Sequence, residues 1–170
     1  MRPTRTVQTS DDKIFQVPEK LLSMTNLKEF LDFPISMCND TIVLPLLIEK
    51  VDRKTMEKVL EWCQYHCDDP EPTEEEKNMD RRKIPIGKWD KEYLEKMGED
   101  MLFNVYKAST YIEIDRLRNL CAKFIASIMM KGKTKEEIDR IFERHRDLTR
   151  KEQAQIDKKA LRDKNGGRKH

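Results

Sequence analysis

The chain has 170 residues, of which 37% are hydrophobic and 39% charged, and its net charge is only +2. This length suits one compact domain with appendages, and so small a net charge argues against a chain-wide basic surface for nucleic acid. No apolar run approaches the roughly 20 residues that span a bilayer, and the N-terminal sequence predicts no signal peptide. Four scattered cysteines predict a reducing compartment, the cytoplasm or nucleus, rather than a disulfide framework: Cys38, Cys63, Cys67 and Cys121.

The first half of the chain predicts strands and a helix. Apolar residues on both sides of the polar turn TSDD predict a short hairpin within the first 17 residues. Residues 18–34 predict a helix between two prolines, because its apolar residues Leu27, Phe30 and Leu31 take the i, i+3, i+4 spacing. The apolar run 41–48 predicts a strand, and Pro45 places it at an edge or a strand end.

The second half predicts mostly helices. Residues 56–67 carry a helical apolar stripe, and residues 68–88 predict a mobile acidic loop because they offer little to bury. Asp90 is the predicted N-cap of the next helix, and residues 101–112 predict another. The clearest periodic stripe then indicates one buried helix face: Leu117, Leu120, Cys121, Phe124, Ile125, Ile128 and Met129.

The stretch KGKT at residues 131–134 raises the question of a phosphate-binding loop. Such a loop needs a glycine five positions before Gly132, where this chain has Ser127, and it needs a preceding strand rather than a helix. Gly132 instead suits a helix C-terminus, and Thr134 with Glu137 forms the T-x-x-E pattern of a capping box. We therefore interpret KGKT as a joint between two helices.

Other candidate sites are equally weak. The stretch CQYHC offers Cys63, His66 and Cys67 as metal ligands, but no second ligand pair lies nearby, so structural cysteines are favoured. Serine, histidine and acidic residues show no pattern typical of nucleophilic or acid–base catalysis. We expect no catalytic residues, no metal and no cofactor.

Several motifs, taken together and in order, resemble the Skp family, the adaptor subunits of SCF (Skp–cullin–F-box) ubiquitin ligases. They are SDDKIFQV, EKVLEWCQYHCDDPEP, IPIGKWD, LFNVYKASTYIEIDRLRNL, KGKTKEEIDRIF and DLTRKEQAQI, and they cover about residues 5–160. The resemblance implies an α/β fold: a BTB/POZ-type domain, with a small sheet and helices, followed by a helical extension. It places a cullin-binding domain at residues 1–131 and an F-box-binding extension at 132–162, before a disordered basic tail at 163–170.

The resemblance also implies two partner surfaces, for a cullin N-terminal domain and for F-box proteins. On the cullin side, the matching residues are Thr110, Tyr111 and Ile112; Thr110 stands where the family usually has asparagine. The short late helices have little chain left to cover them, so their apolar residues are candidate F-box contacts, with ordinary core as an equal alternative. The candidates are Phe124, Ile128, Ile138, Ile141, Phe142, Leu148, Ile156 and Leu161, of which core is favoured for Phe124 and Ile128.

The C-terminal end differs from the family pattern. Residues 145–170 contain nine Lys or Arg against four Asp or Glu, where the family is acidic and carries a tryptophan. The leading hypothesis is a non-catalytic SCF adaptor. An alternative is a Skp-like structural subunit that self-associates, as a homodimer for instance, and no longer works through a cullin. Nucleic-acid binding by the tail is not favoured, because aromatic residues are not interleaved with its charges.

Overall fold

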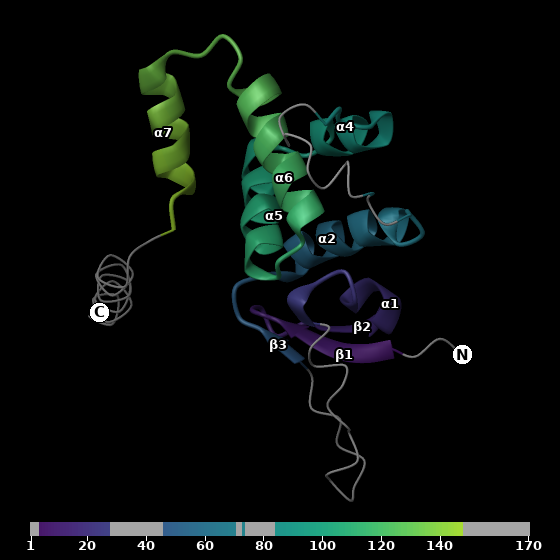
Figure 1. Ribbon diagram of the computed structural model, residues 1–170. Helices are drawn as coiled ribbons and strands as arrows, with labels where there is room; N and C mark the ends of the chain where they lie inside the picture. Colours follow the sequence, from purple (N-terminus) through teal and green to yellow (C-terminus); the bar gives the residue numbers. More distant parts are fainter. Residues whose placement is uncertain (1–3, 28–45, 71–72, 74–83, 148–170) are drawn as a thin grey trace, which may run out of the picture. The chain divides into compact units, whose positions relative to one another are not determined.

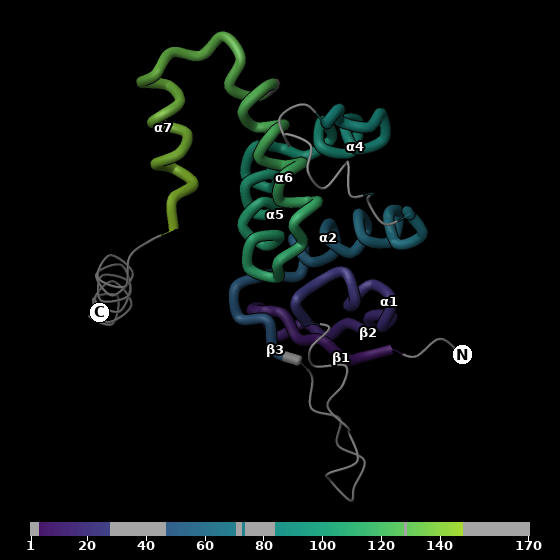
Figure 2. Tube along the Cα trace, viewed as in Figure 1, coloured from purple at the N-terminus to yellow at the C-terminus, as the bar shows by residue number. Residues whose placement is uncertain are grey.

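The computed structural model describes residues 4–27, 46–70, 73 and 84–147 (Figures 1 and 2). By its contacts the chain divides into two units, residues 1–131 and 132–170, which are described separately below. The first unit combines a small sheet with helices, as expected for an α/β fold. No helix of the described ranges has the length and apolar character needed to cross a membrane.

The sheet has three strands in the order β2-β1-β3. Strands β1 (Thr4–Thr9) and β2 (Ile14–Pro18) are antiparallel and form the predicted hairpin, whose turn contains Asp12 in the left-handed region at φ 58°. Strand β3 (Leu46–Ile48) pairs parallel to β1 and lies at an edge of the described sheet, as the nearby proline predicted. One sheet face is buried, with Val7, Val17 and Ile48 in the core.

The helix predicted over residues 18–34 begins after Pro18 as expected, but its described part is much shorter than predicted. Helix α1 (Glu19–Leu22) has four residues and ends before Leu27. The hydroxyl of Ser23 donates to the carbonyl of Lys20, and that of Thr25 donates to the carbonyl of Leu22. Such local side-chain bonds compete with helical backbone bonds and stop the helix. Residues 28–45 lie outside the described part.

Helices α2 (Arg53–His66), α4 (Lys88–Glu95), α5 (Glu99–Tyr111) and α6 (Asp115–Phe124) complete the first unit. Helix α5 packs against both α2 and α6, and α6 also contacts α4 (Figure 2). Residues of the predicted stripes contribute to the core between them, and α2 also buries Trp62. Most of the loop predicted at 68–88 lies outside the described residues.

Asp90 is not the N-cap that the sequence predicted. Gly87 occupies that position, and Asp90 lies in the first turn of α4. Its carboxylate accepts a hydrogen bond of 3.0 Å from the indole N–H of Trp62 on α2. The side chain therefore joins two helices rather than capping one.

The stripe after residue 117 is buried as predicted at Leu117, Cys121, Phe124 and Ile125. It does not belong to one regular helix, however, because α6 ends at Phe124 and a π-helical turn, η3 (Ile125–Met129), continues it. Single π-helical turns inside or beside α-helices are rare. Simple 3.6-residue periodicity contains no signal that would predict one.

The second unit begins at Gly132, whose φ of 78° lies in the left-handed region that favours glycine. Helix α7 (Lys135–His145) follows, with Thr134 as its N-cap. The Thr134 hydroxyl accepts from the backbone N–H of Glu137, and the Glu137 carboxylate accepts from the backbone N–H of Thr134. This is the predicted capping box, so KGKT is a joint between helical segments.

Candidate partner-binding surfaces

The C-terminal end of α5 carries the three residues predicted to bind a cullin. Thr110 and Tyr111 are at the surface, and Tyr111 is 39% exposed. Ile112 is fully buried, because the chain turns inward after α5. Its side chain belongs to the core of the free chain rather than to a surface, so Ile112 is not an exposed partner contact.

The turn after α5 is fixed by backbone hydrogen bonds. The N–H of Ile114 donates to the carbonyl of Ser109 at 2.9 Å, and Glu113 between them has a φ of 55°. The carbonyl of Ile112 accepts from the backbone N–H of Asn26 at 3.0 Å. These bonds hold the backbone on which Tyr111 stands.

The sequence did not point to Lys50, which the fold brings to this surface. Its ammonium nitrogen lies 5.5 Å from the centroid of the Tyr111 ring, within the range of a cation–π contact. Lys50 comes from the turn between β3 and α2, far from Tyr111 in the sequence. No periodicity or motif relates the two residues, so only the tertiary structure could find this pair.

The candidate F-box residues fall into three groups. In α7, Ile138 is half-buried, Ile141 is buried and Phe142 is 48% exposed. Phe124 is a core residue of the first unit, as the sequence favoured. The side chain of Ile128 and all of Leu148, Ile156 and Leu161 lie outside the described residues.

The CQYHC stretch builds a hydrogen-bonded cluster. His66 is buried, its Nδ1 lies 2.6 Å from Asp69 and its Nε2 lies 3.0 Å from Asp90. The hydrogen bond to His66, and to a smaller extent the one to Arg116, lowers the pKa of the Asp69 carboxyl. Within the described ranges, no group of three or more His, Cys, Asp or Glu side chains is arranged so that it could hold a metal ion.

The two buried thiols are unreactive. Burial raises the pKa of Cys63 and of Cys121 to about 12, so both remain protonated at neutral pH. A protonated thiol is neither a nucleophile nor a good metal ligand. Cys63 therefore acts as a small apolar core residue of α2.

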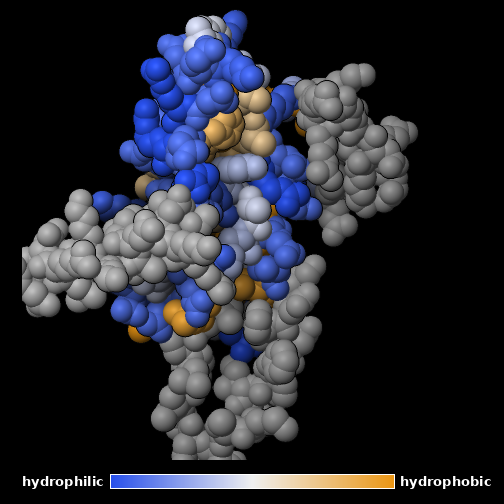
Figure 3. Space-filling model, turned by 90° about the vertical axis from the view of Figure 1, so that its left-hand side faces the viewer, coloured by the Kyte–Doolittle hydropathy of each residue, from blue (hydrophilic) through white to orange (hydrophobic). Residues whose placement is uncertain are grey.

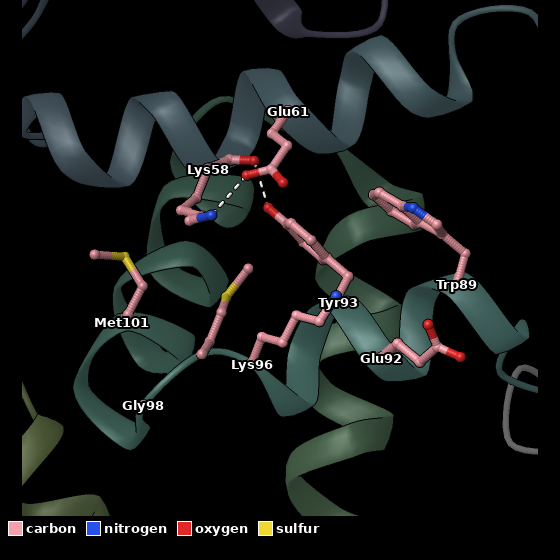
Figure 4. A pocket seen from close by; sticks show the side chains of 9 residues that line it. Lys58, Glu61, Trp89, Glu92, Tyr93, Lys96, Gly98 and Met101 are labelled. Carbon is pink, nitrogen blue, oxygen red and sulfur yellow. Dashed lines mark hydrogen bonds and ion pairs between the residues drawn. The ribbon is translucent and has the colours of Figure 1, made fainter.

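A shallow pocket lies where α4 meets α2 and the start of α5 (Figure 4). The Trp89 ring stacks on Tyr65 at 3.7 Å and on Tyr93 at 4.9 Å between centroids, which attaches α4 to α2. The Tyr93 hydroxyl donates to the carbonyl of Lys58, and the Lys58 ammonium pairs with Glu61. These bonds are structural, and the lining brings together no nucleophile with a base.

On the face that Figure 3 shows, the described surface is mainly hydrophilic, and its hydrophobic residues form small patches. The large hydrophobic side chains that are exposed include Tyr111, Phe142 and Leu47. Single exposed hydrophobic side chains are normal on a protein surface, so their distribution does not by itself identify a partner site.

Comparison with known proteins decides the family. Two Skp1-family models match the chain, the tetramerisation domain at residues 4–68 and the dimerisation domain at residues 115–161. A Skp1-related protein of Caenorhabditis elegans is 34% identical over 154 residues, which cover 89% of this chain and 86% of that protein. The chain belongs to the Skp1 family.

Other Skp1-family relatives carry more specific names. The SCF ubiquitin ligase complex protein SKP1a of Dictyostelium discoideum is 31% identical over 89% of this chain and 90% of its own length. The E3 ubiquitin ligase complex SCF subunit sconC of Talaromyces stipitatus is 37% identical over 66% of this chain and 69% of its own length. The match to these proteins confirms the family that the motifs predicted, including its α/β BTB/POZ-type fold.

Proposed function

We propose that this chain is a non-catalytic adaptor that links F-box substrate receptors to a cullin scaffold in an SCF-type ubiquitin ligase, and so promotes substrate ubiquitination. The observation that carries the proposal is the likeness, over 89% of the chain, to a protein named as part of an SCF ubiquitin ligase complex. Exposed anchors in each unit, Tyr111 in the first and Phe142 in the second, support it. The proposed site of action is the cytoplasm and nucleus.

The proposal also assigns a different partner to each of the two units. Tyr111, at a fixed helix end, is the anchor for the cullin N-terminal domain. The apolar residues Ile138 and Phe142 of α7 contribute to F-box binding, whereas Ile141 is buried in the free chain. Leu148, Ile156 and Leu161 remain predicted contacts. An amphipathic helix beside a partner helix is a common recognition mode.

Two substitutions test this division in one binding experiment. Tyr111→Ala is expected to weaken binding of a purified cullin N-terminal domain at least about tenfold while leaving F-box binding unchanged, because a buried tyrosine anchor contributes about 2 kcal/mol or more. Phe142→Ala is expected to weaken F-box binding and to leave binding of the cullin domain unchanged. Each variant serves as the folding control of the other. The adaptor function is wrong if the unsubstituted chain fails to bind either one of the two partners.

A second candidate function is a self-associating structural subunit. The descriptions of both matched family models, as tetramerisation and dimerisation domains, favour it. Light scattering of the free chain across concentrations, with and without an F-box peptide, separates the two functions. A structural subunit assembles without cullin or F-box partners and does not bind them.

A further inference from the structure

Lys50 is held in a fixed place beside Tyr111. It lies in the turn between β3 and α2, between Ile48 and Val51, which are each 1% exposed. Asp52 follows as the N-cap of α2, and its carboxylate accepts from the backbone N–H of Thr55 at 2.9 Å. The backbone on both sides of Lys50 is therefore anchored, although its side chain reaches the surface.

The backbone that carries Tyr111, the other member of the contact, is also fixed. It is the last residue of α5, and the turn that follows is closed by the backbone hydrogen bonds of Ile112 and Ile114. The Lys50 ammonium, 5.5 Å from the ring centroid, places a positive charge on the aromatic surface. A ring and a cation that are positioned before binding lose little conformational freedom when a partner arrives.

We propose that Lys50 determines the specificity of the Tyr111 surface, by selecting a partner that presents a carboxylate at this point. This inference rests on the proposed function, in which Tyr111 contacts the cullin N-terminal domain. A carboxylate of the partner accepts a charge-assisted hydrogen bond from the Lys50 ammonium while a neighbouring apolar group packs on the Tyr111 ring. Thr110 does not take this donor role, since its hydroxyl donates to the carbonyl of Tyr106 at 2.9 Å.

Calorimetric titration of the full chain with a cullin N-terminal domain, at low and at moderate salt, tests the proposal. Lys50→Glu is expected to weaken binding about tenfold or more at low salt, and Lys50→Met by a smaller factor with a weaker salt dependence. Lys96→Glu is the matched control, since it makes the same charge change at an exposed residue that precedes α5, whereas Tyr111 is the last residue of α5, and its affinity is expected to equal that of the unsubstituted chain.

Charge reversal identifies the partner carboxylate. The Lys50→Glu chain is titrated with cullin-domain variants that each carry one surface Asp or Glu changed to Lys, and one of them is expected to restore binding. The specificity role of Lys50 is overturned if Lys50→Glu binds the cullin domain as tightly as the unsubstituted chain, or if none of the cullin-domain variants restores binding. The adaptor function stands in either case. Failure of the unsubstituted chain to bind the cullin domain overturns both. Retained F-box binding by Lys50→Glu shows that the variant is folded.

Discussion

At the scale of single residues, His66 shows how burial decides the role of a side chain. Both of its ring nitrogens face carboxylates, those of Asp69 and Asp90, and its ring lies 4.3 Å from that of Trp62. The same Asp90 oxygen accepts from the Trp62 indole, and Asp69 also pairs with Arg116 at 2.8 Å. A residue that the sequence offered as a possible metal ligand is thus the centre of a cluster joining α2, α4 and α6.

Asp69 makes part of the stability depend on pH. Its folded-state pKa is lowered by His66 and Arg116, so its contribution is present above the unfolded pKa of about 3.9 and is lost as pH falls through the folded value. Asp69→Asn is expected to lower the free energy of unfolding at pH 7 by roughly 1 kcal/mol, since the carboxylate is one-third exposed and screened by solvent. Urea denaturation measured from pH 7 to 3 checks this.

The free energy of unfolding of the Asp69→Asn chain should also fall less on acidification than that of the unsubstituted chain. Asp139→Asn, an exposed aspartate on α7, is the matched control and is expected to leave the pH profile unchanged. Parallel profiles for the Asp69→Asn and unsubstituted chains would show that the cluster makes no pH-dependent contribution.

At the scale of helices and strands, the ends of elements are decided by local hydrogen bonds. The hydroxyls of Ser23 and Thr25 end α1 after one turn, whereas the capping box at Thr134 begins α7. Both effects use the same chemistry, a short polar side chain that bonds to nearby backbone. Whether it stops or starts a helix depends on which backbone group it meets.

The capping box gives a prediction for α7. Thr134→Ala removes the acceptor for the Glu137 N–H and is expected to cost the helix about 1 kcal/mol. Amide hydrogen exchange is expected to be several-fold faster than in the unsubstituted chain at Glu137, whose N–H bonds to the Thr134 hydroxyl, and at Ile138, whose N–H bonds to the Thr134 carbonyl. Lys131→Ala, at an exposed residue before the capping box, is the control and should leave this exchange unchanged. Equal exchange in the Thr134→Ala chain would mean that the box does not stabilise the helix.

At the scale of the whole molecule, the hydrophobic core belongs to the first unit. Apart from Ile141, the buried hydrophobic residues of the described ranges all lie before Gly132. Stability arises where apolar surface is buried, so the first unit should not depend on the second.

A chain shortened to residues 1–131 is therefore expected to unfold in one cooperative transition. It should bind the cullin N-terminal domain as the full chain does and should lose F-box binding. Thermal unfolding followed by circular dichroism, together with the two binding assays, checks this. A shortened chain without a cooperative transition would show that residues after 131 are needed for folding.

The sequence by itself determined the features that depend on neighbours in the chain. Turn residues predicted the β1–β2 hairpin, periodicity predicted α2, α5 and the buried part of α6, and the T-x-x-E pattern predicted the start of α7. Ordered motifs along the chain were enough to indicate the family, which the comparisons confirmed.

The tertiary structure decided the features that depend on residues far apart in the chain. Asp90 bonds Trp62 and His66 across two helices instead of capping its own, Ile112 turns into the core, and the Lys50 ammonium lies over the Tyr111 ring. A residue's type and spacing set what it can bond to, but only packing brings the partner within reach. For this reason the sequence predicted Tyr111 as an anchor and could not predict the cation beside it.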